Sequence, residues 1–325
     1  MYNHSELKDI IDRAILNLSY NTEAPRLIDP VKYILSIGGK RLRPVMSLMA
    51  CNLFTDKIDD AILPAAGLEV FHNFTLMHDD IMDQASLRRN FPTVHTKWNT
   101  NQAILSGDVM AFIANECFLQ SSPGKLQKVF REFNKAAVEV CIGQQLDLDY
   151  EKASVVTQDE YVRMIELKTA VLLAASMKIG ATIGGSDDYD SELLYEFGKN
   201  IGLAFQIQDD LLDIWGEMKI FGKKSGGDIA ANKKTFPFIK AMELASGKQI
   251  RRLRELFSSE KIHDPVKKIA AVKDIYEELD VKANAEALAN DFISKAFPLL
   301  DKVSVDVSRK KELVGLTSSL IGREF

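Results

Sequence analysis

The chain has 325 residues, 46% of them apolar, and a formal net charge of −5. This length and composition suffice for a large buried core, and the acidic balance argues against nucleic acid as the main partner because no dominant basic surface is implied. The longest apolar runs are far shorter than the roughly 20 residues of a membrane-spanning helix, so we expect no membrane span.

The cysteines and the first residues indicate a cytoplasmic protein. The three cysteines, Cys51, Cys117 and Cys141, are an odd number scattered through apolar segments, which suits reduced, buried thiols rather than a disulfide framework. The first residues do not contain a basic segment followed by an apolar one, so a secretory signal is not indicated.

Two helices are expected before the first basic segment. Residues 5–20 have apolar side chains at about 3.6-residue spacing, as in an amphipathic helix. A second, shorter helix should end at the paired glycines of the sequence GGKRLRP, residues 38–44. Lys40 and Arg43 flank the start of the next helix, where anions are favoured. The segment is therefore a candidate anion site, with an ordinary basic helix cap as the alternative.

A predicted helix over residues 58–86 carries three carboxylates within five residues, in the sequence DDIMD at 79–83. Asp79 and Asp83 are one helical turn apart, on one face. Like charges at this spacing cost about 0.2–0.5 kcal/mol unless a cation lies between them. Mg²⁺ suits such carboxylate oxygens and leaves positions for water and phosphate. The alternative is a solvated acidic helix end.

A short loop with two adjacent arginines, Arg88 and Arg89, follows this cluster, and guanidinium groups match phosphate oxygens well. Helices are then expected at about 98–121 and 125–147. Strands are not expected, because no segment alternates apolar and polar residues over a sustained length. The polar groups of GQQLDL, residues 143–148, either orient metal-bound waters and basic side chains or form a polar helix end.

The acidic pattern returns in the second half of the chain. A capping box at residues 157–160 opens a helix in which Lys168 and Thr169 lie among apolar residues, so that the ammonium group must reach water or an anion. The next helix carries DDLLD at 209–213, again after an aromatic-rich apolar run. Two carboxylate faces directed across a shared cavity make a multi-metal site for a polyanion, and a diphosphate fits it best.

A loop rich in glycine and lysine, residues 222–237, follows the second cluster and either closes over a ligand or is an ordinary solvated loop. The rest of the chain shows amphipathic helices without a catalytic constellation, and Arg323 is either a basic contact or part of a tail. No proline-rich linker divides the sequence, so residues 1–325 are expected to form a single all-α domain.

The chain contains, in this order, the patterns GGKRLRP, DDxxD followed by RRxxPT, KT, FQxxDDxxD and GKxxGxD. With these patterns it closely resembles the trans-isoprenyl diphosphate synthases, from about residue 20 onward. Farnesyl and geranylgeranyl diphosphate synthases belong to this family. The resemblance implies a helical bundle around a deep central cavity, usually a homodimer, with three Mg²⁺ ions bridging the two aspartate clusters and an allylic diphosphate. It also implies condensation of isopentenyl diphosphate with the allylic substrate and release of diphosphate. Asn90 departs from the glycine that usually follows the two arginines.

The resemblance also implies a role for individual residues. Direct metal ligands would be Asp79, Asp83 and Asp209, supported by Asp80, Asp210 and Asp213. The allylic diphosphate would be held by Arg88, Lys168 and Lys223, with Lys234 as a further loop lysine. Isopentenyl diphosphate would be held by Lys40, Arg43, His72 and Arg89. Thr169 and Gln206 would supply dipoles that face the carbocation.

The residues before the first cluster bear on product length. Phe74 lies about 7–8 Å and Phe71 about 12 Å below Asp79 along a helix, and a bulky ring there would stop the growing chain. In the family, an aromatic residue fifth before the first aspartate accompanies short products. Here Phe74 holds that place and Thr75 the fourth, so we expect the C20 product geranylgeranyl diphosphate, with C15 as the alternative. Core packing is the other interpretation of Phe74.

Two other functions are compatible with part of this pattern. A terpene cyclase shares the helical fold and one aspartate-rich cluster, but pairs it with a different Asn/Ser/Glu metal motif. The second DDxxD cluster, together with Lys40 and Arg43, argues against a cyclase. A noncatalytic subunit would be expected to lack one of the clusters, and this chain has both.

Overall fold

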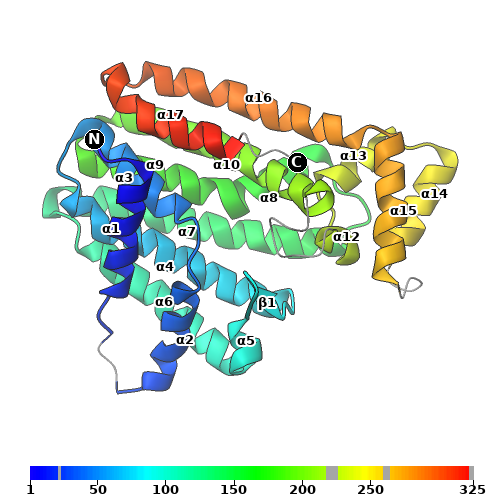
Figure 1. The fold of residues 1–325 in the computed structure, drawn as a ribbon, viewed down its shortest axis with the longest axis horizontal. Helices are drawn as coiled ribbons and strands as arrows, with labels where there is room; N and C mark the ends of the chain where they lie inside the picture. The colour runs from blue at the N-terminus through cyan, green and yellow to red at the C-terminus, as the bar shows by residue number, and fades with distance from the viewer. Residues whose placement is uncertain (21–22, 217–225, 259–263, 322–325) are drawn as a thin grey trace. The chain divides into compact units, whose positions relative to one another are not determined.

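The computed structural model describes residues 1–20, 23–216, 226–258 and 264–321, and this part of the chain is almost entirely helical (Figure 1). The predicted all-α class is confirmed. The contacts divide the chain into two compact units. Unit 1 consists of Met1–Lys135, Leu172–Tyr195 and Leu300–Leu316, and unit 2 of Ala136–Val171, Glu196–Leu299 and Thr317–Phe325. The single-domain expectation stays a prediction.

Unit 1 holds the N-terminal helices and the first acidic cluster. Its helices are α1 (His4–Leu16), α2 (Pro25–Ser36), α3 (Leu42–Phe54), α4 (Asp59–Met82), α5 (Val94–Lys97) and α6 (Thr100–Leu119), with the first part of α7 (Pro123–Lys152), most of α9 (Val171–Gly184), the start of α10 (Asp188–Trp215) and most of α17 (Val307–Ile321). A capping box of Asn3 and Glu6 opens α1. This helix ends four residues earlier than expected, because Asn17 forms its C-cap and asparagine favours helix ends over interiors.

The helices α4 and α6 pack closely because glycines lie where they meet. A methyl group at Gly107 of α6 would come within 2.2 Å of His78 Nε2, and one at Gly67 of α4 within 2.9 Å of Cys117 Cβ. His78 also lies with its Nε2 3.2 Å from the carbonyl oxygen of Ile104. This packing fixes the end of α4, where the first acidic cluster begins.

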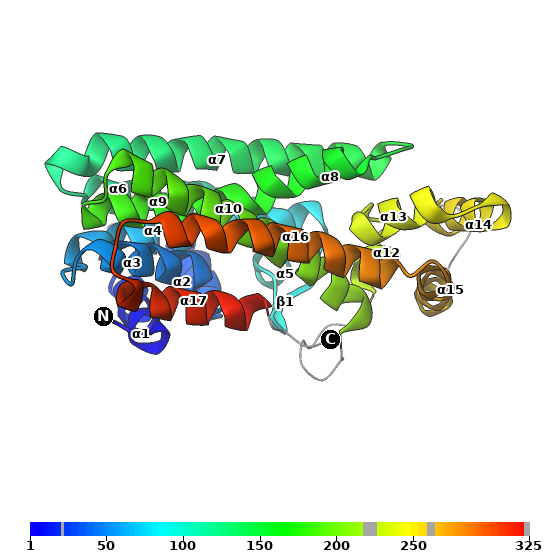
Figure 2. The same ribbon diagram turned by 90° about the horizontal axis from the view of Figure 1, so that it is seen from above.

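Unit 2 is built around the rest of α7 and α10. It adds α8 (Gln158–Ile165), the π-helical turn η1 (Glu166–Ala170), α12 (Gly227–Ala230), α13 (Phe236–Leu244), α14 (Gly247–Phe257), α15 (Pro265–Glu278) and most of α16 (Val281–Lys302). Helices α14 and α15 lie side by side in both views (Figures 1 and 2). The core of this unit includes Tyr161, Ile207, Leu211, Phe236 and Tyr276.

The π-helical turn η1 carries Lys168 and Thr169 and is held between two glycines. A methyl group at Gly143 of α7 would lie 2.2 Å from the backbone nitrogen of Lys168, and one at Gly202 of α10 2.7 Å from Cα of Ala170. Backbone therefore meets backbone on both sides of the turn. Such turns are rare and are frequent at functional sites.

A short β-hairpin follows α4, where the sequence predicts a loop and no strands. Strands β1 (Leu87–Arg88) and β2 (Phe91–Pro92) pair antiparallel. At two residues each they are too short for alternation to be visible in the sequence. The hydroxyl of Tyr33 donates to the carbonyl of Pro92 at 2.8 Å and ties the hairpin to α2.

The turn of this hairpin places Asn90 in the left-handed region, with φ 66°. Asparagine tolerates this region better than other residues except glycine. We expect Asn90→Gly to change the free energy of unfolding by less than about 0.5 kcal/mol, and Asn90→Val to lower it by about 1–2 kcal/mol. Denaturant unfolding of both variants measures this, and equal stabilities would contradict it.

The helical run Gln158–Gly184 is long and apolar enough to cross a membrane by composition, but 78% of its most apolar window is buried inside the protein, as in a core helix. All three cysteines are free thiols. Cys51 and Cys117 are buried as expected, whereas Cys141, in α7, is exposed.

Candidate active site

The first acidic cluster lies at the end of α4. The backbone N–H of Asp83 donates to the carbonyl of Asp79 at 2.8 Å, so the two residues are one helical turn apart and share a face. Asp79 is half-buried and Asp83 exposed. Asp80 is only 2% exposed and takes part in a different interaction.

The carboxylate of Asp80 is held by Arg88 of the hairpin. The Nε of Arg88 lies 3.0 Å from Oδ1 and 2.9 Å from Oδ2, and its Nη2 lies 2.8 Å from Oδ1. A two-pronged contact of this kind is strong and directional. Asp80 is thus tied to the hairpin, and Arg88, which the family resemblance assigns to the allylic diphosphate, is bonded to a carboxylate in this structure.

A basic cluster lies in the same unit, formed by Arg43 of α3, His72 of α4 and Arg89 of the hairpin. The Nη1 of Arg43 is 3.1 Å from Nε2 of His72. The guanidinium group of Arg89 covers Gly39, at which a methyl group would be 2.7 Å from Nη1. Three of the residues expected to hold isopentenyl diphosphate therefore lie together, beside the loop that carries the exposed Lys40.

The electrostatics of the basic cluster keep His72 neutral. Desolvation lowers the pKa of His72 well below its usual value, and the positive charges of Arg43 and Arg89 lower it further. The neutral ring accepts a hydrogen bond from Arg43 through Nε2. A concentration of positive charge around a neutral histidine favours the binding of an anion.

The neutral state of His72 predicts a pH dependence of stability. Below about pH 6.5 an unfolded histidine binds a proton that the folded protein excludes at His72, so stability is fully present above this pH and falls as the pH decreases. In His72→Gln this loss is absent. We expect the difference in unfolding free energy between wild type and variant to change by about 1 kcal/mol between pH 7.5 and 5.5. Denaturant titrations at both pH values test this. A difference in unfolding free energy between wild type and variant that is the same at both pH values would contradict it.

The second acidic cluster lies near the end of α10 in unit 2. Asp210 is 5% exposed and accepts hydrogen bonds from the Tyr161 hydroxyl at 2.5 Å and from Gln206 Nε2 at 2.9 Å. Desolvation, together with the negative charges of Asp228 and Asp209, raises the pKa of Asp210 to about 8. Like Asp80, Asp210 is buried and its carboxylate is held by neighbouring side chains.

Asp209 and Asp213, one turn apart in sequence, are both half-buried. The Oδ2 of Asp213 accepts a hydrogen bond from the backbone N–H of Asp228 at 3.0 Å, and its carbonyl accepts one from Gly226 at 2.6 Å. The cluster is thereby connected to the segment that follows it.

The functional groups of the π-helical turn make specific contacts within unit 2. The Nζ of Lys168 lies 2.5 Å from Oδ2 of Asp147, so the GQQLDL segment orients a basic side chain, one of the two alternatives that its sequence allowed. The hydroxyl of Thr169 donates to Oε1 of Gln206 at 3.0 Å. The amide of Gln206 therefore bridges Thr169 and Asp210.

Three further basic residues were predicted to take part in the site, and the structure describes one of them, Lys234. The Nζ of Lys234 donates to the carbonyls of Tyr150 and Glu151 at 2.8 Å each, at the end of α7. Burial lowers the pKa of Lys234. Lys223 and Arg323 lie outside the described residues.

The residues predicted to limit product length lie in an aromatic cluster of unit 1. The ring of Phe71 is 4% exposed and packs edge-on against Phe133 at 5.3 Å. Phe74 is half-buried, 5.4 Å from Phe71 and 4.8 Å from His78 between ring centres. The hydroxyl of Thr75 donates to the carbonyl of His72. Of the two rings, Phe74 is the less constrained by neighbours.

The acidic clusters have the donor set that Mg²⁺ requires. Each offers a pair of carboxylates one turn apart, and Asp79 and Asp83 reach solvent. Within the described ranges no three His, Cys, Asp or Glu side chains form a ready-made metal cage. This fits Mg²⁺, which commonly binds one or two carboxylates and completes its shell with water and substrate phosphates.

Tyr161 was not assigned by sequence reasoning, and Asp147 was identified only as part of the GQQLDL segment, without its partner Lys168. Tyr161 lies 49 residues from Asp210, and Asp147 lies 21 residues from Lys168. A charged residue inside an apolar helix, such as Lys168, signals that a partner exists, but not which one. Tyr161 gives no such signal, because a buried tyrosine is common in a core.

An all-α chain with two helix-borne aspartate clusters has the isoprenoid synthase type of fold, and comparisons with known proteins define it more narrowly. The sequence profile of the polyprenyl synthetase family matches residues 24–279, and the chain belongs to this family. A geranylgeranyl diphosphate synthase from Methanosarcina mazei is 36% identical over 97% of this chain and 95% of its own length. A geranylfarnesyl diphosphate synthase from Natronomonas pharaonis is 39% identical over 71% of this chain and 73% of its own length. The crystal structure of a geranylgeranyl pyrophosphate synthase is 38% identical, covers 100% of both chains and gives a TM-score of 0.94.

Proposed function

We propose that this protein is a Mg²⁺-dependent, cytoplasmic short-chain trans-prenyltransferase that condenses isopentenyl diphosphate with an allylic diphosphate. The observation that carries the proposal is that one chain holds both aspartate clusters and, beside the first, the basic cluster of Arg43, His72 and Arg89. Metal-binding carboxylates suit a diphosphate that leaves. A separate basic cluster suits a second diphosphate that remains attached to its substrate. Chain elongation needs such a second diphosphate substrate, and cyclisation does not.

The reaction breaks the allylic C–O bond, and the electron pair departs with diphosphate. The double bond of isopentenyl diphosphate then forms the new C–C bond, and a proton is lost to the departing diphosphate. Bound Mg²⁺, three ions by family resemblance, would neutralise the charge that develops on the leaving group. Asp79, Asp83 and Asp209 would hold these ions, and Asp80, Asp210 and Asp213 would support them.

Two different sets of basic side chains would hold the diphosphates of the two substrates. Lys168 and Arg88, with Lys223 and Lys234, would donate to the allylic diphosphate. Donors preorganised where negative charge develops lower the barrier most. Lys40, Arg43, His72 and Arg89 would bind isopentenyl diphosphate.

The contacts of Thr169 suggest how a carbocation is stabilised without being captured. The hydroxyl of Thr169 donates its hydrogen to Gln206, and the amide of Gln206 donates in turn to Asp210. The oxygen lone pairs of Thr169 then remain to face a cation. In this arrangement Thr169 is the contacting dipole, and Gln206 holds it in orientation.

Phe74 supports geranylgeranyl diphosphate as the product, with farnesyl diphosphate as the alternative. A half-buried ring on α4, five residues before Asp79, would limit the space for a growing chain. Relatives of similar identity include both a geranylgeranyl and a geranylfarnesyl diphosphate synthase. Overall similarity therefore does not decide chain length, whereas a residue of this kind can.

Chromatography of the products tests the function directly. The purified protein is incubated with isopentenyl diphosphate, Mg²⁺ and a C5, C10 or C15 allylic diphosphate in turn. We expect linear prenyl diphosphates that end at C20, and no product when Mg²⁺ is removed with a chelator. Cyclised hydrocarbons without elongation would overturn the proposal.

The outer face of α6 supports a homodimer. Four large apolar side chains are exposed on this helix, Phe112 at 68%, Leu105 at 57%, Leu119 at 47% and Ile104 at 41%. Such a face on one helix is typical of a protein interface. We expect wild-type protein to sediment as a dimer and Phe112→Asp to sediment as a monomer at micromolar concentration. A dimer of unchanged affinity in the variant would place the interface elsewhere.

A further inference from the structure

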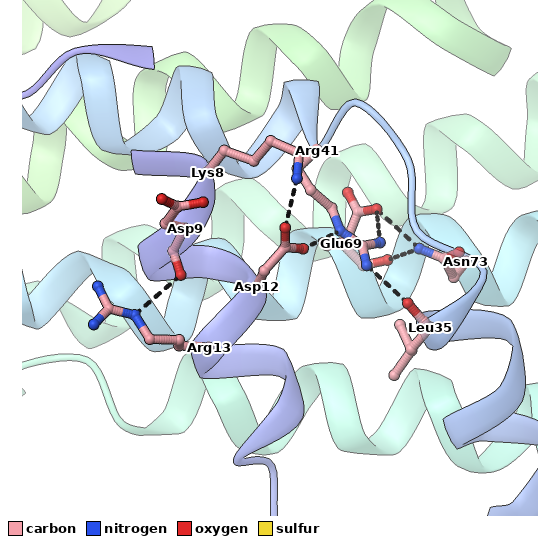
Figure 3. A network of polar contacts seen from close by, with 8 residues as sticks. All are labelled: Lys8, Asp9, Asp12, Arg13, Leu35, Arg41, Glu69 and Asn73. Atoms are coloured by element: carbon pink, nitrogen blue, oxygen red, sulfur yellow. Dashed lines mark hydrogen bonds and ion pairs between the residues drawn. The ribbon is translucent and has the colours of Figure 1, made fainter. Parts of the chain in front are cut away.

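Arg41 lies between Lys40 and Arg43, two of the four residues expected to bind isopentenyl diphosphate, yet its side chain is buried. Its guanidinium group contacts three helices of unit 1 (Figure 3). The Nε donates to Asp12 of α1 at 2.9 Å, Nη1 to Glu69 of α4 at 2.8 Å, and Nη2 to the carbonyl of Leu35 in α2 at 2.7 Å. The fixed fork of an arginine suits three such acceptors, and a lysine cannot replace it.

The backbone of Arg41 adopts an unfavourable conformation that these contacts hold in place. Its φ of 49° and ψ of 35° lie in the left-handed region, directly before the first residue of α3. A residue with a side chain adopts this region at a cost. Because Lys40 and Arg43 are one and two residues away, the conformation of Arg41 sets the direction of both side chains.

The acceptor of Arg41 on α4 lies next to the basic cluster. Glu69 is 2% exposed, and its Oε1 also accepts a hydrogen bond from Asn73 at 3.1 Å, which fixes the carboxylate (Figure 3). His72 follows Glu69 by three residues, on the same side of α4, and contacts Arg43 at 3.1 Å. The ion pair therefore joins the start of α3, which Lys40 precedes and which carries Arg43, to the turn of α4 that carries His72.

We propose that the buried Arg41–Glu69 pair is a positioning device for the isopentenyl diphosphate site. It holds Lys40 and Arg43 at a fixed distance from His72, and it touches neither substrate. The proposal rests on the proposed function, because it concerns the affinity for one of its two substrates. The proposal predicts different effects on the two substrates. Loss of the pair should weaken the binding of isopentenyl diphosphate and leave the binding of the allylic diphosphate unchanged.

Steady-state kinetics with Arg41→Gln test this. We expect the KM for isopentenyl diphosphate to rise at least about tenfold, because small displacements of binding groups have large effects. The KM for the allylic diphosphate and kcat should change by less than about twofold. Arg13→Gln is the matched control, since Arg13 donates only to the carbonyl of Asp9 on its own helix in the contacts described, and it should leave both KM values unchanged.

A double variant separates positioning from stability. Removing one partner of a buried ion pair destabilises a protein, whereas replacing both by apolar residues is often neutral. Arg41→Met combined with Glu69→Met should therefore recover the thermal stability lost in Arg41→Gln while keeping the raised KM for isopentenyl diphosphate. Recovery of the KM together with stability would show that the pair is only structural, and would overturn the inference.

The remaining outcomes are also decisive. An equal rise of both KM values in Arg41→Gln would overturn the positioning role, as would an unchanged KM for isopentenyl diphosphate. Calorimetric binding of isopentenyl diphosphate to the wild type gives a readout that does not depend on turnover. If the wild type neither binds nor elongates this substrate, the proposed function itself fails, which is distinct from failure of the Arg41 inference alone.

Discussion

Replacing Asp79 with asparagine should lower kcat for prenyl transfer by about 10³-fold. The substitution keeps the shape of the side chain and removes the negative charge that attracts a divalent cation. Asp79 is half-buried at the end of α4 and shares a face with Asp83. The adjacent carboxylate of Asp80 is held by Arg88. Initial rates at saturating substrates and increasing Mg²⁺ measure the effect.

The matched control for this prediction lies on the same helix. Asp59 is exposed in the first turn of α4, where Asp59→Asn changes only the interaction with the helix dipole, by about 0.3–1 kcal/mol of stability, and should leave kcat unchanged. If Asp79→Asn retained more than about a tenth of the wild-type kcat, the assignment of Asp79 as a metal ligand would be wrong.

A double variant tests whether the two clusters serve one reaction. Asp209→Asn alone should lower kcat about as much as Asp79→Asn. Residues that act as a unit are strongly non-additive. We therefore expect the combined Asp79→Asn and Asp209→Asn variant to be little worse than either single variant. Multiplied losses would indicate that the clusters act independently, and the proposed mechanism would need revision.

Phe74→Ala should lengthen the product by at least one C5 unit. Truncation removes a ring five residues before Asp79 on α4, and Phe74 is only half-buried, so part of the vacated space can accept a longer prenyl chain. Phe71→Ala is a poorer test, because Phe71 is 4% exposed and truncating a buried phenylalanine costs about 3–5 kcal/mol of stability. Product chromatography with the C15 allylic substrate gives the distribution.

Phe130→Ala is the control for chain length. Phe130 is also half-buried and packs against Phe133 of the same aromatic cluster, with ring centres 6.3 Å apart, but it comes from α7. Its truncation should leave the product at the wild-type length. If Phe74→Ala and Phe130→Ala gave the same product as wild type, chain length would be limited by other residues, and Phe74 would be a packing residue only.

Local rules predicted the features that depend on neighbours in sequence. The helix expected at about 98–121 is found as α6, Thr100–Leu119, and the one-turn spacing of Asp79 and Asp83 follows from helical geometry alone. The bounds of α7 were less accurate: it runs over Pro123–Lys152 rather than 125–147. Helix ends depend on capping and packing as well as on periodicity.

Partners far apart in sequence could not be predicted in this way. The bond between Tyr161 and Asp210 and the pairing of Arg41 with Glu69 join residues 49 and 28 positions apart. They arise from the packing of helices whose order in space the sequence pattern does not define. The hairpin at Arg88 and Arg89 was missed for a different reason, since two-residue strands have no period to detect.

The π-helical turn at Glu166–Ala170 has a consequence for sequence change in this protein. One residue more or less in a helix rotates everything beyond it by about 100°. A single-residue deletion between residues 166 and 170 would let the segment relax into a regular helix, leaving the fold intact while Lys168 and Thr169 faced other neighbours. Deletion of one residue at this turn should therefore abolish turnover while the protein still folds.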